Sequence, residues 1–372
     1  MAYIKSTLSI FRKNIVLTVA VVVALITSVI VKPDRQYLSY FDLKTLTCLF
    51  CTLAVVCAFK NIHLFEITAR KIVTMFHTAR YAVIALVYIT FIGSMVLAND
   101  MALLTFLPLG YFVLSSTNNK KYMAFTFIMQ DISANLGGMI TPFGNPQNLY
   151  LYSYFNISNS EFVKIMALPF FVSVFLITAC CFFVGKEELK LNNECSEKLN
   201  VPRSIIYAVL FVFAIMIVFG VVPYYVGFAV IFVAVFILDR KALLQVDYPL
   251  LLTFCAFFVF AGNMARIPAV NKFLGGLISK NTLLYGVLSC QFISNVPSAI
   301  LLSKFTMNYP ELLVAVNIGG AGTLIASLAS LITFREYSKY APNEISTYVL
   351  KFSLFNFAIL IILLIIMSIY FA

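Results

Sequence analysis

Long apolar stretches alternate with short polar loops along the whole chain. They fall at residues 14–31, 43–60, 82–115, 121–154, 161–184, 204–221, 223–239, 248–262, 282–307, 310–335 and 346–371. Because a helix needs about 20 apolar residues to cross a bilayer, this pattern predicts an all-α integral membrane protein. Two further segments, 62–78 and 267–278, carry apolar residues on only one helical face, which is typical of helices that lie in the membrane interface.

Four of these stretches do not fit a single straight span. The 34 residues of 121–154 would make a helix of about 50 Å, and their centre holds Gly137, Gly138, Pro142, Gly144 and Pro146. We therefore predict a helix that breaks near the membrane midplane, since free backbone survives in a bilayer only where it lines a site or is buried. Segment 310–335 is expected to break in the same way.

Segments 82–115 and 282–307 carry polar residues at their centres, namely Ala98-Asn99-Asp100 and Ser294-Asn295-Val296. The arms of the first have about 15 residues each, too few to cross comfortably. Both segments are therefore predicted to be re-entrant hairpins whose tips lie deep in the membrane. With the hairpins counted as non-crossing, about nine transmembrane helices remain.

The two halves of the chain resemble each other. Residues 135–141 (NLGGMIT) and 317–323 (NIGGAGT) share four identities in seven at matching places, which is the mark of repeats found in many transporters. We predict a first repeat at 1–184, a charged cytoplasmic linker at 185–203 and a second repeat at 204–372. Matching spans are separated by an odd number of crossings, so the repeats are predicted to have inverted topology.

Composition narrows the class of protein. Apolar residues make up 62% of the chain and charged residues 11%, whereas soluble domains have roughly 45–50% and about 25%. This excludes a cytosolic enzyme and a nucleic-acid binder. An N-terminus inside puts 18 of the 26 Lys and Arg residues on the cytoplasmic side, so we expect a plasma-membrane protein with a cytoplasmic N-terminus and an external C-terminus.

Enzymatic and metal-centre signals are missing from the sequence. There is no phosphate-binding Gly-rich loop with its Lys, and the two histidines, His63 and His77, lie together on one interfacial segment. Cys48 and Cys51 have a redox-like spacing, but inside an apolar stretch we interpret them as packing residues. We therefore expect no enzyme, no resident metal and no cofactor.

Two hairpin tips and two helix breaks are predicted to meet near midplane. Such points offer carbonyls that favour cations and free N–H groups that favour anions. Neutral polar side chains add to them, so the set could hold a cation and an anion without a fixed positive charge. The predicted site residues are Asn99, Asp100, Thr141, Asn145, Gln147, Ser294, Asn295, Thr323 and Ser327.

Two carboxylates stand out because charged groups within a membrane are costly and mostly functional. Asp100 is expected either to bind Na⁺ or carry a proton, or to cap the hairpin tip. Na⁺ could be held at Asn99, Asp100 and Asn295. Asp131, one helical turn before Asn135, either belongs to the ion path or makes a hydrogen bond on the entry side.

The two tip sequences and the stretch 135–148 resemble those of the ion transporter superfamily. That stretch includes Thr141-Pro142-Phe143-Gly144-Asn145-Pro146-Gln147-Asn148. It includes divalent anion:sodium symporters, citrate transporters, arsenite permeases and related sodium/proton antiporters. The resemblance covers nearly the whole chain and implies two inverted repeats, a homodimer formed by a scaffold region, and elevator-like motion. In the symporters each tip carries Ser-Asn-Thr, which helps to form sodium sites and contacts the substrate carboxylate. Here the first tip keeps only Asn99, and Val296 replaces Thr at the second.

The resulting hypothesis is a secondary transporter, coupled to Na⁺ or H⁺, that moves a small anion by alternating access. A di- or tricarboxylate such as citrate or succinate is the expected substrate. The Asn-Asp tip is more similar to the antiporter and arsenite-permease branches. A Na⁺/H⁺ antiporter and an arsenite or oxyanion efflux permease therefore remain open as alternatives, and a membrane enzyme or passive scaffold is a third.

Overall fold

The computed structural model describes residues 14–188 and 199–372, and every regular element in this part of the chain is helical. The predicted all-α membrane class is confirmed. Six of the described helices are long and apolar enough to cross a membrane. These are α3 (Leu43–Asn61), α5 (Ala79–Leu97), α9 (Asn159–Cys181), α10 (Val201–Val218), α13 (Tyr248–Arg266) and α19 (Ile345–Phe371).

The predicted spans map onto this set as follows. Five of the nine are α3, α9, α10, α13 and α19, whereas α5 is an arm of the first hairpin. Two more are the shorter helices α2 (Ile15–Ile30) and α11 (Tyr224–Leu238). The last two are broken helices. The basic patch at Lys5, Arg12 and Lys13 and the centre of the linker, 189–198, lie outside the described residues.

Both hairpin segments fold back at the predicted tips. The first consists of α5 and α6 (Asn99–Ser116), and the second of α15 (Thr282–Ile293) and α16 (Asn295–Leu302). The expectation of short arms was wrong for the first hairpin, whose arms have 19 and 18 residues. The predicted segment began at residue 82, where the apolar run begins, whereas α5 begins at Ala79. Reversal of the chain at Ala98, rather than arm length, therefore makes this hairpin.

Both long polar-centred segments break where the sequence predicted. In the first, α7 (Met123–Gly137) runs into a short 3₁₀ turn, and α8 (Pro146–Tyr154) starts after an irregular stretch. In the second, α17 (Tyr309–Ile318) is separated from α18 (Leu328–Tyr340) by an irregular stretch of the same kind. Pro146 suits the first position of α8, where no N–H is needed.

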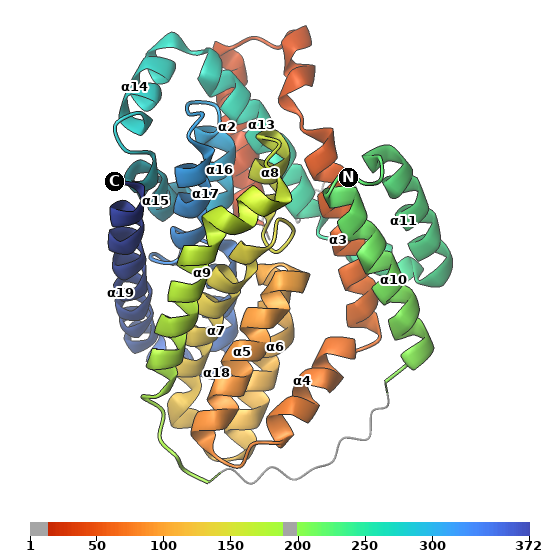
Figure 1. The fold of residues 1–372 in the computed structure, drawn as a ribbon, viewed down its shortest axis with the longest axis vertical. Coiled ribbons are helices and arrows are strands. Elements are labelled where there is room, and N and C mark those ends of the chain that lie inside the picture. Colours follow the sequence, from red (N-terminus) through yellow and green to blue (C-terminus); the bar gives the residue numbers. More distant parts are fainter. Residues whose placement is uncertain (1–13, 189–198) are drawn as a thin grey trace, which may run out of the picture.

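The hairpins lie toward opposite ends of the long axis (Figure 1). Helix α7 packs with α5 and α6, and α17 packs with α15 and α16. The second halves of the broken helices are exchanged: α8 packs on α16 and α17, whereas α18 packs on α6 and α7. The helices predicted to be interfacial, α4 (Leu64–Thr74) and α14 (Pro268–Ile278), also lie toward opposite ends (Figure 1). The inverted relation of the repeats stays a prediction.

A glycine allows the closest approach between the first hairpin and its broken helix. A Cβ added to Gly137 would lie 2.3 Å from the Phe91 carbonyl oxygen and 2.6 Å from Ser94 Oγ. The backbone oxygen cannot rotate away as a flexible side chain could. The last turn of α7 can therefore rest on α5 only if this position lacks a side chain.

We predict that Gly137→Ala lowers the free energy of unfolding by about 1–3 kcal/mol through overpacking. The measurement is thermal unfolding of the purified protein in detergent. Gly276→Ala is the matched control, since a Cβ at that helical position of α14 meets nothing within 4 Å, and alanine favours a helix. Equal melting temperatures for both variants would contradict the close contact.

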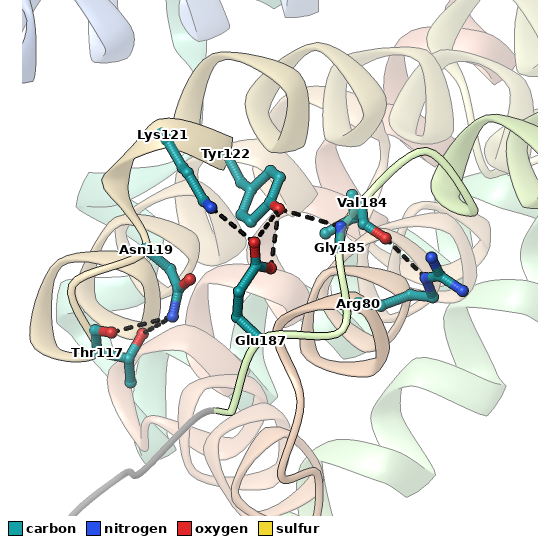
Figure 2. A network of polar contacts seen from close by, with 8 residues as sticks. All are labelled: Arg80, Thr117, Asn119, Lys121, Tyr122, Val184, Gly185 and Glu187. Atoms are coloured by element: carbon teal, nitrogen blue, oxygen red, sulfur yellow. Dashed lines mark hydrogen bonds and ion pairs between the residues drawn. The ribbon is translucent and has the colours of Figure 1, made fainter.

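The residues that follow α9 are bonded to the start of the first hairpin and to the residues just before α7 (Figure 2). Lys121 Nζ donates to the Glu187 carboxylate at 2.6 Å, and Tyr122 Oη donates to it at 2.8 Å. Arg80 Nε donates to the Val184 carbonyl at 2.6 Å, and the Ala79 N–H donates to the Glu187 carbonyl at 2.9 Å. Hydrogen bonds from Lys121 and Tyr122 lower the pKa of the Glu187 carboxyl to about 2.

This contact predicts a pH dependence of stability. The pKa of Glu187 in the folded state lies below the ordinary Glu value of about 4.3. Its stabilising effect is therefore complete above that value and disappears as the pH falls through about 2. Glu187→Gln should lower the melting temperature slightly at pH 7, because the pair is exposed. The difference from the wild type should shrink as the pH falls below about 4, and a constant difference would contradict the assignment.

Candidate functional site

Both hairpin tips turn on a residue with the same unusual backbone. Ala98 has φ 65° and ψ 149°, and Ser294 has φ 73° and ψ 158°. This left-handed extended region is essentially reserved for glycine and costs about 1–3 kcal/mol for other residues. The asparagine that follows each tip residue accepts the next backbone N–H, from Asp100 to Asn99 Oδ1 at 3.0 Å and from Val296 to Asn295 Oδ1 at 2.9 Å.

Each break is fastened to its own hairpin by a threonine. Thr141 Oγ1 donates to the Met95 carbonyl at 3.0 Å, and Thr323 Oγ1 donates to the Gln291 carbonyl at 3.0 Å. Met95 and Gln291 both precede their tip residue by three positions. The two threonines therefore set the position of each tip relative to its break.

Buried asparagines connect the breaks to each other and to the first tip. Asn317 Nδ2 donates to Asn148 Oδ1 at 2.6 Å, and Asn145 Nδ2 donates to Asn317 Oδ1 at 3.3 Å. Asn99 Nδ2 donates to Asn135 Oδ1 at 3.2 Å. All five side chains are buried, so this polar chain crosses the centre of the protein away from solvent.

The second tip reaches the same centre beside a glycine. A Cβ on Gly320 would lie 3.1 Å from Asn295 Nδ2 and 3.4 Å from Asn135 Oδ1. The missing side chain at Gly320 thus leaves room for both amides beside the second break. Asn99 and Asn295, predicted separately from two distant segments, both reach the surroundings of Asn135.

A cavity of about 480 Å³ lies at this junction. Its polar lining includes both tips and the starts of α8 and α18, and its apolar lining comes mainly from α2, α13 and the second hairpin. Six of the nine predicted site residues line it: Asn99, Asp100, Gln147, Ser294, Asn295 and Ser327. The other three, Thr141, Asn145 and Thr323, instead hold the backbone behind it.

Four helices begin at the cavity wall, namely α6, α8, α16 and α18. A helix N-terminus carries about half a positive charge from its free N–H groups. Among the residues that the structure describes, no Lys, Arg or His lines the cavity, and Asp100 is the only carboxylate there. Asp100 Oδ1 and Gln147 Oε1 are shielded from solvent, and neither has a hydrogen-bond partner within the described chain. The wall therefore has positive helix ends together with free oxygen acceptors.

Asp131 does not line this cavity. It is fully buried on α7, and its two carboxyl oxygens lie 3.2 Å from Ser330 Oγ and 3.4 Å from Thr333 Oγ1 of α18. These contacts join Asp131 to α18 in the second half of the chain, and both interpretations of Asp131 stay predictions.

Two residues that were not among the predicted site residues, Gln291 and Asn148, satisfy the carbonyls of the breaks. Gln291 Nε2 donates to the Gly319 and Ala321 carbonyls at 2.9 and 3.1 Å. Asn148 Nδ2 donates to three carbonyls of the first break, with lengths from 3.2 to 3.3 Å. For Gln291 the available signal was an amide in an apolar hairpin arm, one turn before the tip.

Similarity to known proteins agrees with this architecture. A family model described as "Citrate transporter" matches residues 7–311. The chain belongs to the citrate transporter family. It is 33% identical over 295 residues to a protein of Methanocaldococcus jannaschii named as an uncharacterized transporter, covering 78% of this chain and 80% of that protein. It is 30% identical over 289 residues to inner membrane protein YbiR of Escherichia coli, covering 73% of each.

Membership in the citrate transporter family places the chain among multi-pass membrane transporters of anions. This is a family of transporters. The resemblance to the ion transporter superfamily is therefore confirmed. The individual roles of the cavity residues stay predictions.

The backbone of the first tip predicts a stabilising substitution. The side chain of Ala98 is a methyl group that caps α6 without a hydrogen bond, so Ala98→Gly removes the strain at the cost of one half-buried methyl group. Relief of about 1–3 kcal/mol exceeds the added unfolded-state entropy of about 0.4–1 kcal/mol, so the melting temperature should rise. Ala98→Val should lower it, since β-branching is least tolerated there. A lower melting temperature for Ala98→Gly would contradict the strained tip.

Proposed function

We propose that this protein is a secondary transporter, coupled to Na⁺ or H⁺, that carries a small di- or tricarboxylate such as citrate or succinate by alternating access. The observation that carries the proposal is the convergence of four helix N-termini and one carboxylate on a single cavity. Transport is proposed to involve a homodimer with elevator-like motion in the plasma membrane, with a cytoplasmic N-terminus and an external C-terminus.

The charges at the cavity support coupling between a cation and an anion. Four helix N-termini together supply about two positive charges, and Asp100 subtracts one when ionised. A dicarboxylate is therefore balanced only when a cation or a proton neutralises Asp100. Neither ion is bound well alone, which is the condition for moving both together.

The oxygens around the tips suit a hard monovalent cation. Asp100 Oδ1 has no hydrogen-bond partner in the described part of the chain, and amide oxygens of Asn99 and Asn295 lie at the two tips. Carboxylate and carbonyl oxygens are the ligands that such ions prefer. We propose that Na⁺, where it is the coupling ion, binds among these three residues.

The proposal is tested by uptake into proteoliposomes. Labelled citrate or succinate should accumulate when an inward Na⁺ or H⁺ gradient is imposed. Asn99→Ala and Asn295→Ala should each lower uptake about tenfold, corresponding to about 1.4 kcal/mol of lost binding. Asn356→Ala is the matched control, because Asn356 is a buried asparagine of α19 that does not line the cavity. Unchanged uptake in both tip variants would show that the tips are not the site.

A second candidate, a Na⁺/H⁺ antiporter, is favoured by the unpartnered Asp100 oxygen at the cavity. In vesicles that contain a pH-sensitive dye and no organic anion, an antiporter would release protons on addition of Na⁺. Asp100→Asn should abolish that signal. Anion uptake without such a signal would favour the first proposal over exchange.

A further inference from the structure

Asp131 is a fully buried carboxyl that the cavity does not use. It lies on α7, within the first repeat, and both of its hydrogen-bond partners lie on α18, within the second. Ser330 Oγ is 3.2 Å from Asp131 Oδ2, and Thr333 Oγ1 is 3.4 Å from Asp131 Oδ1. No Lys, Arg or His of the described residues pairs with it. A buried carboxylate without a cationic partner is strongly disfavoured.

The hydroxyl of Thr333 leaves a place for a proton. Thr333 Oγ1 also lies 3.0 Å from the Ala329 carbonyl, and it has a single hydrogen to donate. The shorter contact takes that hydrogen, because a hydrogen bond weakens with distance. Thr333 Oγ1 then offers only a lone pair to Asp131 Oδ1. A proton on Asp131 would complete a chain of donors from Asp131 to Thr333 to the Ala329 carbonyl.

The donor set suits a proton better than a metal cation. Two carboxylate oxygens and two hydroxyls face one another here, whereas hard metal cations usually take about six or more oxygen ligands. No group of three or more His, Cys, Asp or Glu residues exists in the described chain that could supply more. A proton needs one acceptor, and Thr333 supplies it.

The other titratable groups near Asp131 do not neutralise it. Asp100 of α6 and Tyr348 of α19 act on it electrostatically, and either would repel a negative charge when ionised. The Tyr348 hydroxyl is buried and has no partner among the described groups.

Three ionisable side chains on other helices packed on α7 have partners away from Asp131. Tyr88 of α5 bonds to Thr178, Glu161 of α9 accepts from Tyr309, and Glu311 of α17 accepts from the Leu283 N–H.

We propose that Asp131 carries the coupling proton. The proton binds Asp131 from one side of the membrane and is released to the other, with no further reactant. Asp131 joins α7, which precedes the first break, to α18, which follows the second. Protonation of Asp131 therefore changes the contact between α7 and α18. This inference rests on the proposed transport function and names H⁺ as a coupling ion at a place separate from the cavity.

The first test is infrared spectroscopy of the purified full chain at neutral pH. The wild type should show a protonated-carboxyl band that Asp131→Asn lacks, while Asp34→Asn should leave it unchanged, since Asp34 is paired with Arg266 at 2.7 Å. Thr333→Val keeps the carboxyl but removes its acceptor, so it should shift the band. The same band in the wild type and in Asp131→Asn would overturn the proposal, as would loss of the band on adding Na⁺ at constant pH.

The second test is flux of labelled citrate and succinate in proteoliposomes. Asp131→Asn should keep exchange of anion at equal pH on both sides but lose pH-driven accumulation at least tenfold. Accumulation equal to that of the wild type would overturn the proposal. If the wild type moves neither anion, the proposed function fails for these substrates, and the infrared band still decides whether Asp131 holds a proton.

Discussion

Each peptide group freed by a broken helix must find a partner inside this protein, because lipid offers none. The structure meets this requirement with side-chain amides and hydroxyls. Asn148 serves the carbonyls of the first break and Gln291 those of the second, while Thr141 and Thr323 tie each break to its hairpin. The backbone behind the cavity is satisfied in this way.

The second halves of the broken helices are exchanged, which places the polar clusters between the two halves of the chain. Since α8 packs on the second hairpin and α18 on the first, each polar cluster is made from both halves. The asparagine chain joins Asn145 and Asn148 to Asn317, and Asp131 joins α7 to α18. Each such junction joins helices from the two halves of the chain.

Much of the fold can be predicted from the sequence, because a bilayer restricts the backbone structures that can cross it. Apolar stretches, two polar-centred hairpins and two Gly-rich and Pro-rich breaks are local features, and the structure has them at the predicted places. The length of the first hairpin was not predicted correctly, because apolar patterning misses the start of α5 at Ala79, next to the charged Arg80. At the site, residues at tips and breaks could be named in advance. The strain at Ala98 and Ser294 could not, because alanine and serine rarely adopt that backbone conformation.

The sequence by itself determined the membrane class and the kinds of side chain available at the tips and breaks, since these follow from hydrophobicity and local backbone preference. Only the tertiary structure decided which polar residues face the cavity and which hold the backbone. It separated Gln147 and Ser327, which line the cavity, from Thr141 and Thr323, which brace it. It also paired Asp131 with a helix some 200 residues away, at Ser330. Such contacts depend on which helices pack together, and a hydrophobic pattern does not indicate which helix will be the neighbour of another.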